Sequence, residues 1–387
     1  MDNIYLKTSF LCDCGTQHTF SSRILDNFSC LETIKPSGTN ILFIGDCIDT
    51  KKTLNKRFRV TTLLDNTGKE DIRLVVGQGE KANHAKYIAK KLGLECIIIG
   101  SGAFLNQSII CHKDGFFQAI ATPPHFILPH EDKNATDLSD NFALAALSIL
   151  SIFEWHLTNN QKVCPVIFKE AQNITRDLIA VASKTGLASS SVLKESVLDA
   201  NLKLAIIHEY LNPSPHINGA IQTAAALSRL FFVERNTNIE RLFSRALIVS
   251  PVIIKAYEAF LSDGIGATYA PPNNSLRIEK LVDFFGIKEA TALKAMPPYL
   301  KRVELEKQDY LLKLYRAEYL DFIKGIKALM NEALFLFFKL LPDGGFEYRE
   351  WADSLELGLS IGLGSDILKG ATLLSMMRDK GALDELI

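Results

Sequence analysis

The sequence predicts an α/β domain followed by an all-α domain. Up to Gly102, short apolar runs alternate with helical segments, as in a mostly parallel sheet covered by helices. After about residue 139, nearly every segment has helical periodicity. A glycine turn between two early strands is the third observation, because such turns bind phosphate groups in α/β domains. We therefore predict a Rossmann-like, parallel-sheet nucleotide-binding domain over residues 1–138 and a helical bundle over residues 139–387.

The composition is that of an ordinary globular protein. The chain has 387 residues, of which 47% are hydrophobic and 22% charged, and its net charge is −1. At about 150 residues per domain, this length suggests two domains. The charge balance gives no sign of nucleic acid or an anionic membrane as a partner. We expect no secretory leader and no membrane span, because the longest apolar run, Phe142–Phe153, is shorter than the ~20 residues that a span needs.

The cysteines indicate a reducing compartment. Seven of them are spread thinly along the chain, which fits free thiols and a cytoplasmic protein better than a disulfide framework. Cys12, Cys14 and His18 bring together three soft metal ligands near the N-terminus. A structural zinc site needs a fourth ligand, and Cys-x-Cys is tighter than the usual spacing. An irregular N-terminal turn is therefore the alternative interpretation.

Four strands are expected before Gly102, and the next segments change in character. The four strands are Ile41–Gly45, Arg59–Leu64, Leu74–Val76 and Cys96–Ile99. Beyond them, Ile109–Cys111 and Phe117–Ala121 are separated by turn residues and predict a hairpin, and Phe126–Leu128 is expected to close the sheet.

The glycine turn Gly77-Gln78-Gly79 follows the third of these strands. Ala82, Ala85, Lys86 and Ala89 then recur at helical spacing, and Gly93 ends the helix. The first backbone N–H groups of such a helix have no intrahelical partner and lie at the positive end of its dipole, which favours a bound phosphate. The alternative is that the glycines serve only the backbone conformation.

Asp46 follows the first of these strands. An acidic residue there accepts hydrogen bonds from a ribose in dinucleotide-binding folds. Asp49 competes for this role, and a helix N-cap before residues 50–56 is the alternative for Asp46.

The second domain is expected to be a bundle of long helices. Pro251 is expected to kink one of them. The predicted helices are Asn141–Leu157, Ile167–Leu187, Ser189–Leu211, Asn218–Phe232, Asn238–Leu261, Val303–Leu340 and a helical pair over Asp366–Leu386.

Four segments resemble the bacterial sn-glycerol-1-phosphate dehydrogenases, in the superfamily of iron-containing alcohol dehydrogenases and dehydroquinate synthases. CDCGTQH, from Cys12, is similar to the family's Cys-x-Cys-Gly-x-x-His start, and ILFIGDCIDT, from Ile41, to its strand ending in Asp and Thr. VGQGEKANHAKYIA, from Val76, is similar to its Gly-Gly-Gly turn and helix, and KGATLLSMMRDKGALDEL, from Lys369, to its C-terminal helix. The resemblance covers the whole chain and implies a dehydroquinate synthase-like fold.

The resemblance also implies a reaction and a metal site. In the family, NAD(P)H reduces dihydroxyacetone phosphate, and a divalent metal held by one Asp and two His polarises the carbonyl. Counting along the chain places these ligands at Leu144, at Ile221 or Gln222, and at Ser250, and a lysine of the family at Ser148. None of these residues is Asp or His. The nearest imidazole, His216, is either a displaced ligand or an exposed loop residue.

The nucleotide site implied by the resemblance is partly eroded. Its middle glycine is Gln78, which would be strained if that position needed a positive φ. We expect NAD or NADP, and no metal at the family site. The cofactor-binding candidates are Asp46, Gly77, Gln78, Gly79, Glu80, Asn83, Ser101 and Gly102, with Gly77–Glu80 and Ser101–Phe104 lining a cleft between the domains.

Three functional hypotheses follow. The first is a non-catalytic relative that keeps the fold and binds a dinucleotide, a small phosphorylated ligand or a protein partner. A homodimer is compatible with this hypothesis. The second is an active NAD(P)-dependent oxidoreductase that reduces dihydroxyacetone phosphate or a similar ketone or polyol. The third is a lyase or synthase chemistry on the same scaffold, because a fold does not fix a function.

Overall fold

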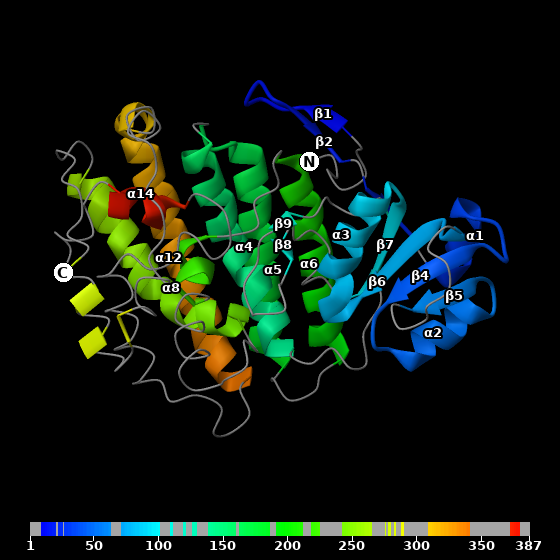
Figure 1. The fold of residues 1–387 in the computed structure, drawn as a ribbon. Helices are drawn as coiled ribbons and strands as arrows, with labels where there is room; N and C mark the ends of the chain where they lie inside the picture. Colours follow the sequence, from blue (N-terminus) through cyan, green and yellow to red (C-terminus); the bar gives the residue numbers. More distant parts are fainter. Residues whose placement is uncertain are drawn as a thin grey trace. The chain divides into compact units, whose positions relative to one another are not determined.

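The computed structural model divides into two compact units (Figure 1). Unit 1 contains Met1–Asn141 and Ser191–His216, and unit 2 contains Phe142–Ser190 and Ile217–Ile387. The structure describes residues 9–20, 22–25, 27–62, 71–100, 109–110, 119–120, 126–129, 138–159, 162–185, 191–211, 218–224, 242–264, 275, 278–279, 282–283, 288–289, 309–340 and 372–379.

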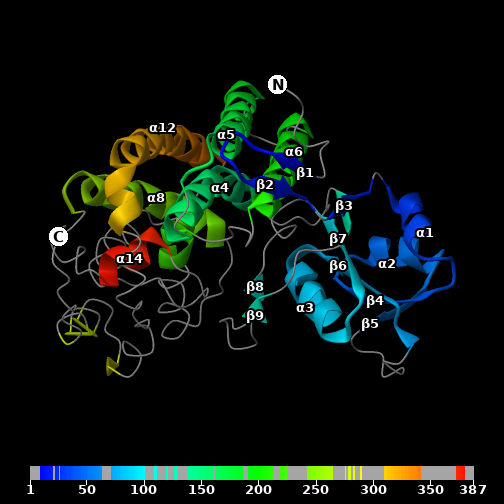
Figure 2. The ribbon, with the colours of Figure 1, turned by 90° about the horizontal axis from the view of Figure 1, so that it is seen from above.

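Unit 1 is built on a six-stranded sheet with strand order β3-β10-β7-β6-β4-β5. Figure 2 labels the strands β3, β7, β6, β4 and β5 of this sheet. Every neighbouring pair is parallel, as the alternation of strands and helices predicted. The strands are β3 (Arg23–Ile24), β4 (Asn40–Ile44), β5 (Arg59–Thr62), β6 (Leu74–Gln78), β7 (Glu95–Gly100) and β10 (Phe126–Pro129). The central strands pair with Val76 opposite both Phe43 and Ile97.

Alternate side chains of the central strands enter two apolar cores. Val76 and Ile97 belong to the core that contains Leu54 of the helix α2 (Ile48–Asn55). Val75 and Ile98 belong to the other core, which is covered by the helix α3 (Ala82–Leu92) and by part of α6 (Ser191–Tyr210). Both faces of the central strands β4, β6 and β7 are therefore buried, which explains why these strands are continuous apolar runs in the sequence.

Two small antiparallel hairpins accompany the sheet. The first pairs β1 (Ser9–Leu11) with β2 (Gln17–Thr19), and the second pairs β8 (Ile109–Ile110) with β9 (Ala119–Ile120). The second was predicted. The first corrects the interpretation of the N-terminus as an irregular turn. Strand β10 joins the sheet as expected but does not close it, because β3 pairs with its other edge.

The described residues of unit 2 form helices and short non-helical segments, with no strand among them. The helix α12 (Arg316–Leu340) packs against α8 (Leu242–Ala259) and α5 (Pro165–Thr185). Two aromatic contacts lie in this core: Phe153 with Tyr319 at 6.2 Å between ring centroids, and Phe168 with Phe322 at 4.5 Å. The remaining helical segments are α4 (Leu138–Thr158), residues 219–224, the π-helical turn η5 (Phe260–Gly264), residues 309–314 and α14 (Leu373–Asp379), with further helical residues at 275, 278–279, 282–283 and 289.

The helix α4 begins in unit 1 and continues into unit 2. Its 21 residues are long and apolar enough to cross a membrane, but 89% of its apolar window is buried inside the protein. This burial is typical of a core helix, and the predicted helix over residues 141–157 lies within it.

The other predicted helices agree with the described parts of unit 2, with one difference: the long helix predicted over Val303–Leu340 is interrupted at Tyr315. Pro251 lies inside α8, and the kink expected there stays a prediction. Of the predicted C-terminal helical pair, residues 372–379 are described, and α14 lies there. The predicted domain boundary at residue 138 stays a prediction. By its contacts, the segment Ser191–His216 belongs to unit 1.

Candidate functional site

The predicted glycine turn joins β6 to α3 through a single 3₁₀ turn, η4 (Gly79–Lys81). Gly79 has φ +59°, a left-handed conformation that favours glycine. Gln78 is extended, with φ −141° and ψ 143°, so it carries no backbone strain. Neither Gln78 nor Lys81 caps its helix with a side chain. The turn therefore presents a helix N-terminus of the kind that binds anions.

Gly77 has a different role from Gly79. A Cβ at Gly77 would lie 2.4 Å from Cβ of Ala85 and 2.9 Å from Cδ1 of Ile98. Only glycine therefore allows α3 to pack this closely on the sheet. The end of the neighbouring strand is also close, because a Cβ at Gly100 would lie 3.9 Å from the backbone nitrogen of Gly79.

Gln78 is a polar side chain in an apolar setting. It is 3% exposed, and neither Nε2 nor Oε1 has a hydrogen-bond partner among the described residues. A buried amide without hydrogen-bond partners lowers the stability of a folded protein by roughly 1–3 kcal/mol, so the presence of glutamine at this position needs an explanation. The sequence predicted Gln78 as part of the turn but contained no sign that its amide would be buried.

Asp46 lies just beyond β4, on the loop that leads to α2. Its carboxylate, 76% exposed, forms an ion pair with Lys81 of the glycine turn. The N-cap of α2 is Cys47, so Asp46 does not have the capping role that was its alternative. Asp49 lies in the first turn of α2, with Lys52 3.7 Å away.

The structure describes the other cofactor candidates in part. Glu80 lies in η4 and Asn83 in α3, and their side chains lie outside the described residues. Ser101, Gly102 and the rest of 101–104 also lie outside them. Their predicted roles, and the predicted cleft, stay predictions.

Lys86 is a buried cation one turn along α3. It is 1% exposed, and burial lowers the pKa of its ammonium group to about 7, against the opposing effect of Cys96 and Glu209. Glu209 of α6 also accepts a hydrogen bond from the backbone N–H of Ser22, at 2.9 Å. The helical spacing placed Lys86 on the apolar side of α3, and this was the available signal of its burial.

The positions that the resemblance matches to a metal site lie on helices of unit 2. Ile221 and Gln222 are buried, and Oε1 of Gln222 accepts a hydrogen bond of 2.6 Å from Oγ1 of Thr372. Ser250 donates to the carbonyl of Leu247 at 2.8 Å. Leu144 is half-buried, and its carbonyl accepts from Ser148 at 2.9 Å. His216 lies outside the described residues.

Unit 2 contains a buried carboxylate that the sequence patterns did not reveal. Glu154 of α4 is 1% exposed, and it accepts hydrogen bonds of 2.9 Å from the backbone N–H groups of Gly219 and Leu373. The Tyr257 side chain also forms a hydrogen bond with Glu154. The hydroxyl of Tyr257 in turn accepts a hydrogen bond of 3.2 Å from the backbone N–H of Leu374. Burial raises the pKa of Glu154 to about 8, although these donors act to lower it. A single glutamate in a helix that is apolar all round is the signal that could have identified it.

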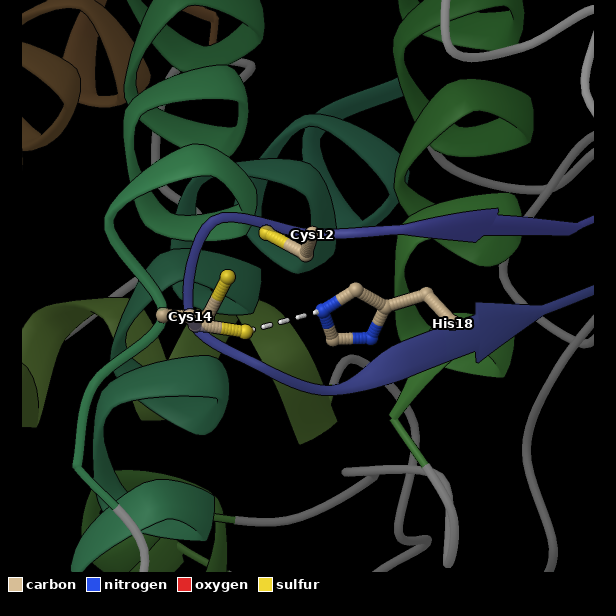
Figure 3. A group of neighbouring side chains, drawn as sticks. Cys12, Cys14 and His18 are labelled. Carbon is tan, nitrogen blue, oxygen red and sulfur yellow. Dashed lines mark hydrogen bonds between the residues drawn. The ribbon is translucent and has the colours of Figure 1, made fainter.

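The β1–β2 hairpin brings together the side chains of Cys12, Cys14 and His18 (Figure 3). Their ligand atoms lie within 4.8 Å of one another. Cys12 and His18 are buried, and Cys14 is exposed. The structure thus brings together the three residues that the sequence predicted as candidate metal ligands.

Comparisons with known proteins identify the fold. No family model matches the chain, and no curated protein matches it in sequence. A solved 1,3-propanediol oxidoreductase matches with a TM-score of 0.51 and 10% identity over 94% of this chain and 97% of that chain.

Two further solved structures match more weakly. An archaeal halo-thermophilic alcohol dehydrogenase from a Red Sea brine pool has a TM-score of 0.48 and 12% identity, over 96% of this chain and 99% of that chain. A glycerol dehydrogenase from Schizosaccharomyces pombe has a TM-score of 0.46 and 15% identity, over 94% of this chain and 96% of that chain. The predicted dehydrogenase-like α/β fold is thus confirmed, through its likeness to the 1,3-propanediol oxidoreductase.

Proposed function

We propose that the chain is a divergent relative of the sn-glycerol-1-phosphate dehydrogenases that binds a dinucleotide but has lost metal-dependent hydride transfer. The turn from β6 to α3 carries this proposal. Gly79 adopts a left-handed conformation directly before an uncapped helix N-terminus, and the buried amide of Gln78 adjoins it. NAD or NADP is the expected ligand, bound in the cytoplasm.

Backbone N–H groups would hold the pyrophosphate. They point out of the first turn of η4 and α3, and they bind phosphate oxygens whatever side chains follow. Gln78 would donate its amide N–H to the ligand and so satisfy an atom that lacks a partner among the described residues.

Asp46 would accept the ribose hydroxyls. Its present partner is Lys81, and both side chains are well exposed, at 76% and 49%. An exposed ion pair contributes about 1 kcal/mol or less, so a ribose hydroxyl competes with it readily.

The residues that the resemblance matches to the family's metal positions do not fit a metal. Leu144 and Ile221 have no donor atom, and the side chains of Gln222 and Ser250 are neutral and already hydrogen-bonded within unit 2. A catalytic zinc or iron site needs three protein ligands, with imidazole, thiolate or carboxylate among them. Without such an electrophile, the alkoxide that forms when a ketone accepts hydride is left without a positive partner.

Calorimetry with NADH, NADPH and ATP tests the binding site. Wild type should bind at least one of them at millimolar concentration or below, and Gly79→Ala should abolish binding, because a side chain there strains the turn and blocks the phosphate. Gly93→Ala is the matched control. Gly93 has a similar φ, +65°, at the opposite end of α3, and a Cβ added there would have no atom within 4 Å. Equal loss of affinity in both variants, or no binding by wild type, would refute the site.

Turnover tests the loss of catalysis. Oxidation of NADH and NADPH by dihydroxyacetone phosphate should be absent with or without added Zn²⁺, Fe²⁺ or Ni²⁺. The experiment is repeated in a Cys12→Ser, Cys14→Ser variant, so that metal on the N-terminal hairpin does not confuse the result. Turnover that chelators remove, with one metal equivalent retained in this variant, would favour the alternative function, an active oxidoreductase of a small ketone or polyol.

A further inference from the structure

The loop of the N-terminal hairpin folds two thiols toward one side. The backbone N–H of Cys12 donates to the carbonyl of Thr16 at 3.0 Å, and that of Gly15 donates to the carbonyl of Cys12 at 2.8 Å. Gly15 has φ +84°, which lets the chain reverse within this short loop. Cys12 and Cys14 therefore share one tight loop, and His18 follows it on β2 (Figure 3).

The ring of His18 is oriented as a metal ligand. Its Nδ1 lies 3.1 Å from the backbone carbonyl of Tyr210 on α6. Because a carbonyl oxygen only accepts, Nδ1 carries the hydrogen and Nε2 keeps its lone pair. Metal-binding histidines typically donate their second ring nitrogen to a carbonyl or carboxylate in this way. The Nε2 lone pair faces Sγ of Cys14, at 3.5 Å.

The spacing of the donor atoms fits a tetrahedral ion. With Zn–S near 2.3 Å and Zn–N near 2.05 Å, a tetrahedral angle separates sulfur from nitrogen by about 3.6 Å and two sulfurs by about 3.8 Å. The distance of 3.5 Å from Cys14 Sγ to His18 Nε2 agrees with the first value. All three ligand atoms lie within 4.8 Å of one another, so a small contraction of the loop completes the geometry.

We propose that Cys12, Cys14 and His18 form a structural Zn²⁺ site that fastens the β1–β2 hairpin. On binding, the two thiols release their protons and each sulfur donates an electron pair to the ion, while His18 donates through Nε2. The remaining tetrahedral position belongs to water or to one further ligand of the chain. This site is separate from the dinucleotide turn and does not rest on the proposed function.

A bound ion would stabilise a hairpin that is too short to be stable by itself. Its strands have three residues each, and an isolated two-stranded hairpin of this size is marginally stable in water. Besides the hydrogen bond of His18 to the carbonyl of Tyr210, the hairpin has aromatic contacts with α6: the ring of Tyr210 lies 5.2 Å from that of Phe10 and 6.2 Å from that of Phe20, between centroids. A bound ion would hold Cys12, Cys14 and His18 together and so stabilise the loop end of the hairpin.

Titration with Co²⁺ tests the proposal, because cobalt reports thiolate ligands by its absorption. The full-length protein is stripped with a chelator under reducing conditions and titrated with Co²⁺, and Zn²⁺ is then added. We expect one equivalent of cobalt with a thiolate-to-metal charge-transfer band and tetrahedral d–d bands, all abolished by Zn²⁺. Absence of these bands, or octahedral cobalt only, would overturn the proposal.

Variants locate the ion. Cys14→Ser should remove the charge-transfer band or weaken binding at least tenfold, and since Cys14 is exposed the variant should keep the wild-type circular dichroism spectrum. Cys30→Ser with Cys47→Ser is the matched control, and it should bind like wild type. Retention of wild-type affinity in Cys14→Ser would place the ion elsewhere and overturn the proposal.

Serine variants of Cys96, Cys111 and Cys164 extend this test. A fall of the charge-transfer intensity by about one third in one of them, with cobalt still bound, would support the hairpin site and identify a third thiolate as its completing ligand. Complete loss of binding in one of them, together with retained binding in Cys14→Ser, would contradict the hairpin site.

Discussion

The buried carboxylate of Glu154 should make the stability of the protein fall as pH rises. Its pKa in the folded protein is about 8, against an ordinary value of 4.5, because burial disfavours the charged form. Between these two values the folded protein holds a proton that the unfolded chain has released. Stability is therefore greatest below the ordinary pKa and is lost as pH rises toward 8. Between pH 4.5 and 8 the loss in the free energy of unfolding is about 5 kcal/mol, of which about 2–3 kcal/mol falls between pH 5.5 and 7.5.

Urea unfolding of wild type and Glu154→Gln at these two pH values measures this effect. The stability of wild type relative to Glu154→Gln should fall by about 2–3 kcal/mol between pH 5.5 and 7.5. Glu332→Gln is the control, because Glu332 on α12 is exposed and its removal should leave the wild-type pH dependence in place. A relative stability that is constant or rises with pH would show that Gly219, Leu373 and Tyr257 hold Glu154 ionised, and it would refute the reasoning.

Two further predictions concern the packing around this carboxylate. In the urea assay, Gly219→Ala should destabilise the protein by about 3 kcal/mol, because its Cβ would lie 2.1 Å from the Tyr257 hydroxyl. Gly325→Ala is the control and should be neutral or stabilising, because its Cβ meets only the end of the Gln172 side chain, at 3.1 Å. Thr372→Val should cost about 1 kcal/mol, because it removes the hydroxyl that donates to Gln222, and an unchanged urea midpoint would contradict this.

The sequence predicted the elements that have strong patterns. The central strands β4, β6 and β7 are apolar runs buried on both faces, so their existence follows from composition alone. Strand β3 was missed because it is two exposed residues, Arg23–Ile24, with no alternation to detect. The periodicity of α6 identified a helix, but it does not say which core a helix joins. The membership of α6 in unit 1 depends on long-range contacts such as that of Ala205 with the sheet core.

The candidate site was predictable where glycine chemistry or ligand type determines it. Gly77, Gly79 and the three candidate metal ligands of the hairpin were identified because their residue types and spacing have chemical meaning. The sequence did not predict the burial of Gln78 or the hydrogen bonds of Glu154, since each depends on segments that are distant in the sequence. A polar residue in an apolar run is a signal of a site, but the sequence does not name its partners.

The middle position of the glycine turn now has a physical interpretation. Gln78 is extended and Gly79 is left-handed, so Gln78 carries no backbone strain, and its side-chain amide is buried. If the turn bound no ligand, an apolar side chain of the same size would be more stable, by roughly 1–3 kcal/mol. Gln78→Met should therefore raise the free energy of unfolding without ligand while weakening dinucleotide binding in calorimetry. A variant that is less stable than wild type would show that the amide of Gln78 is satisfied within the protein, and the argument that it awaits a ligand would fail.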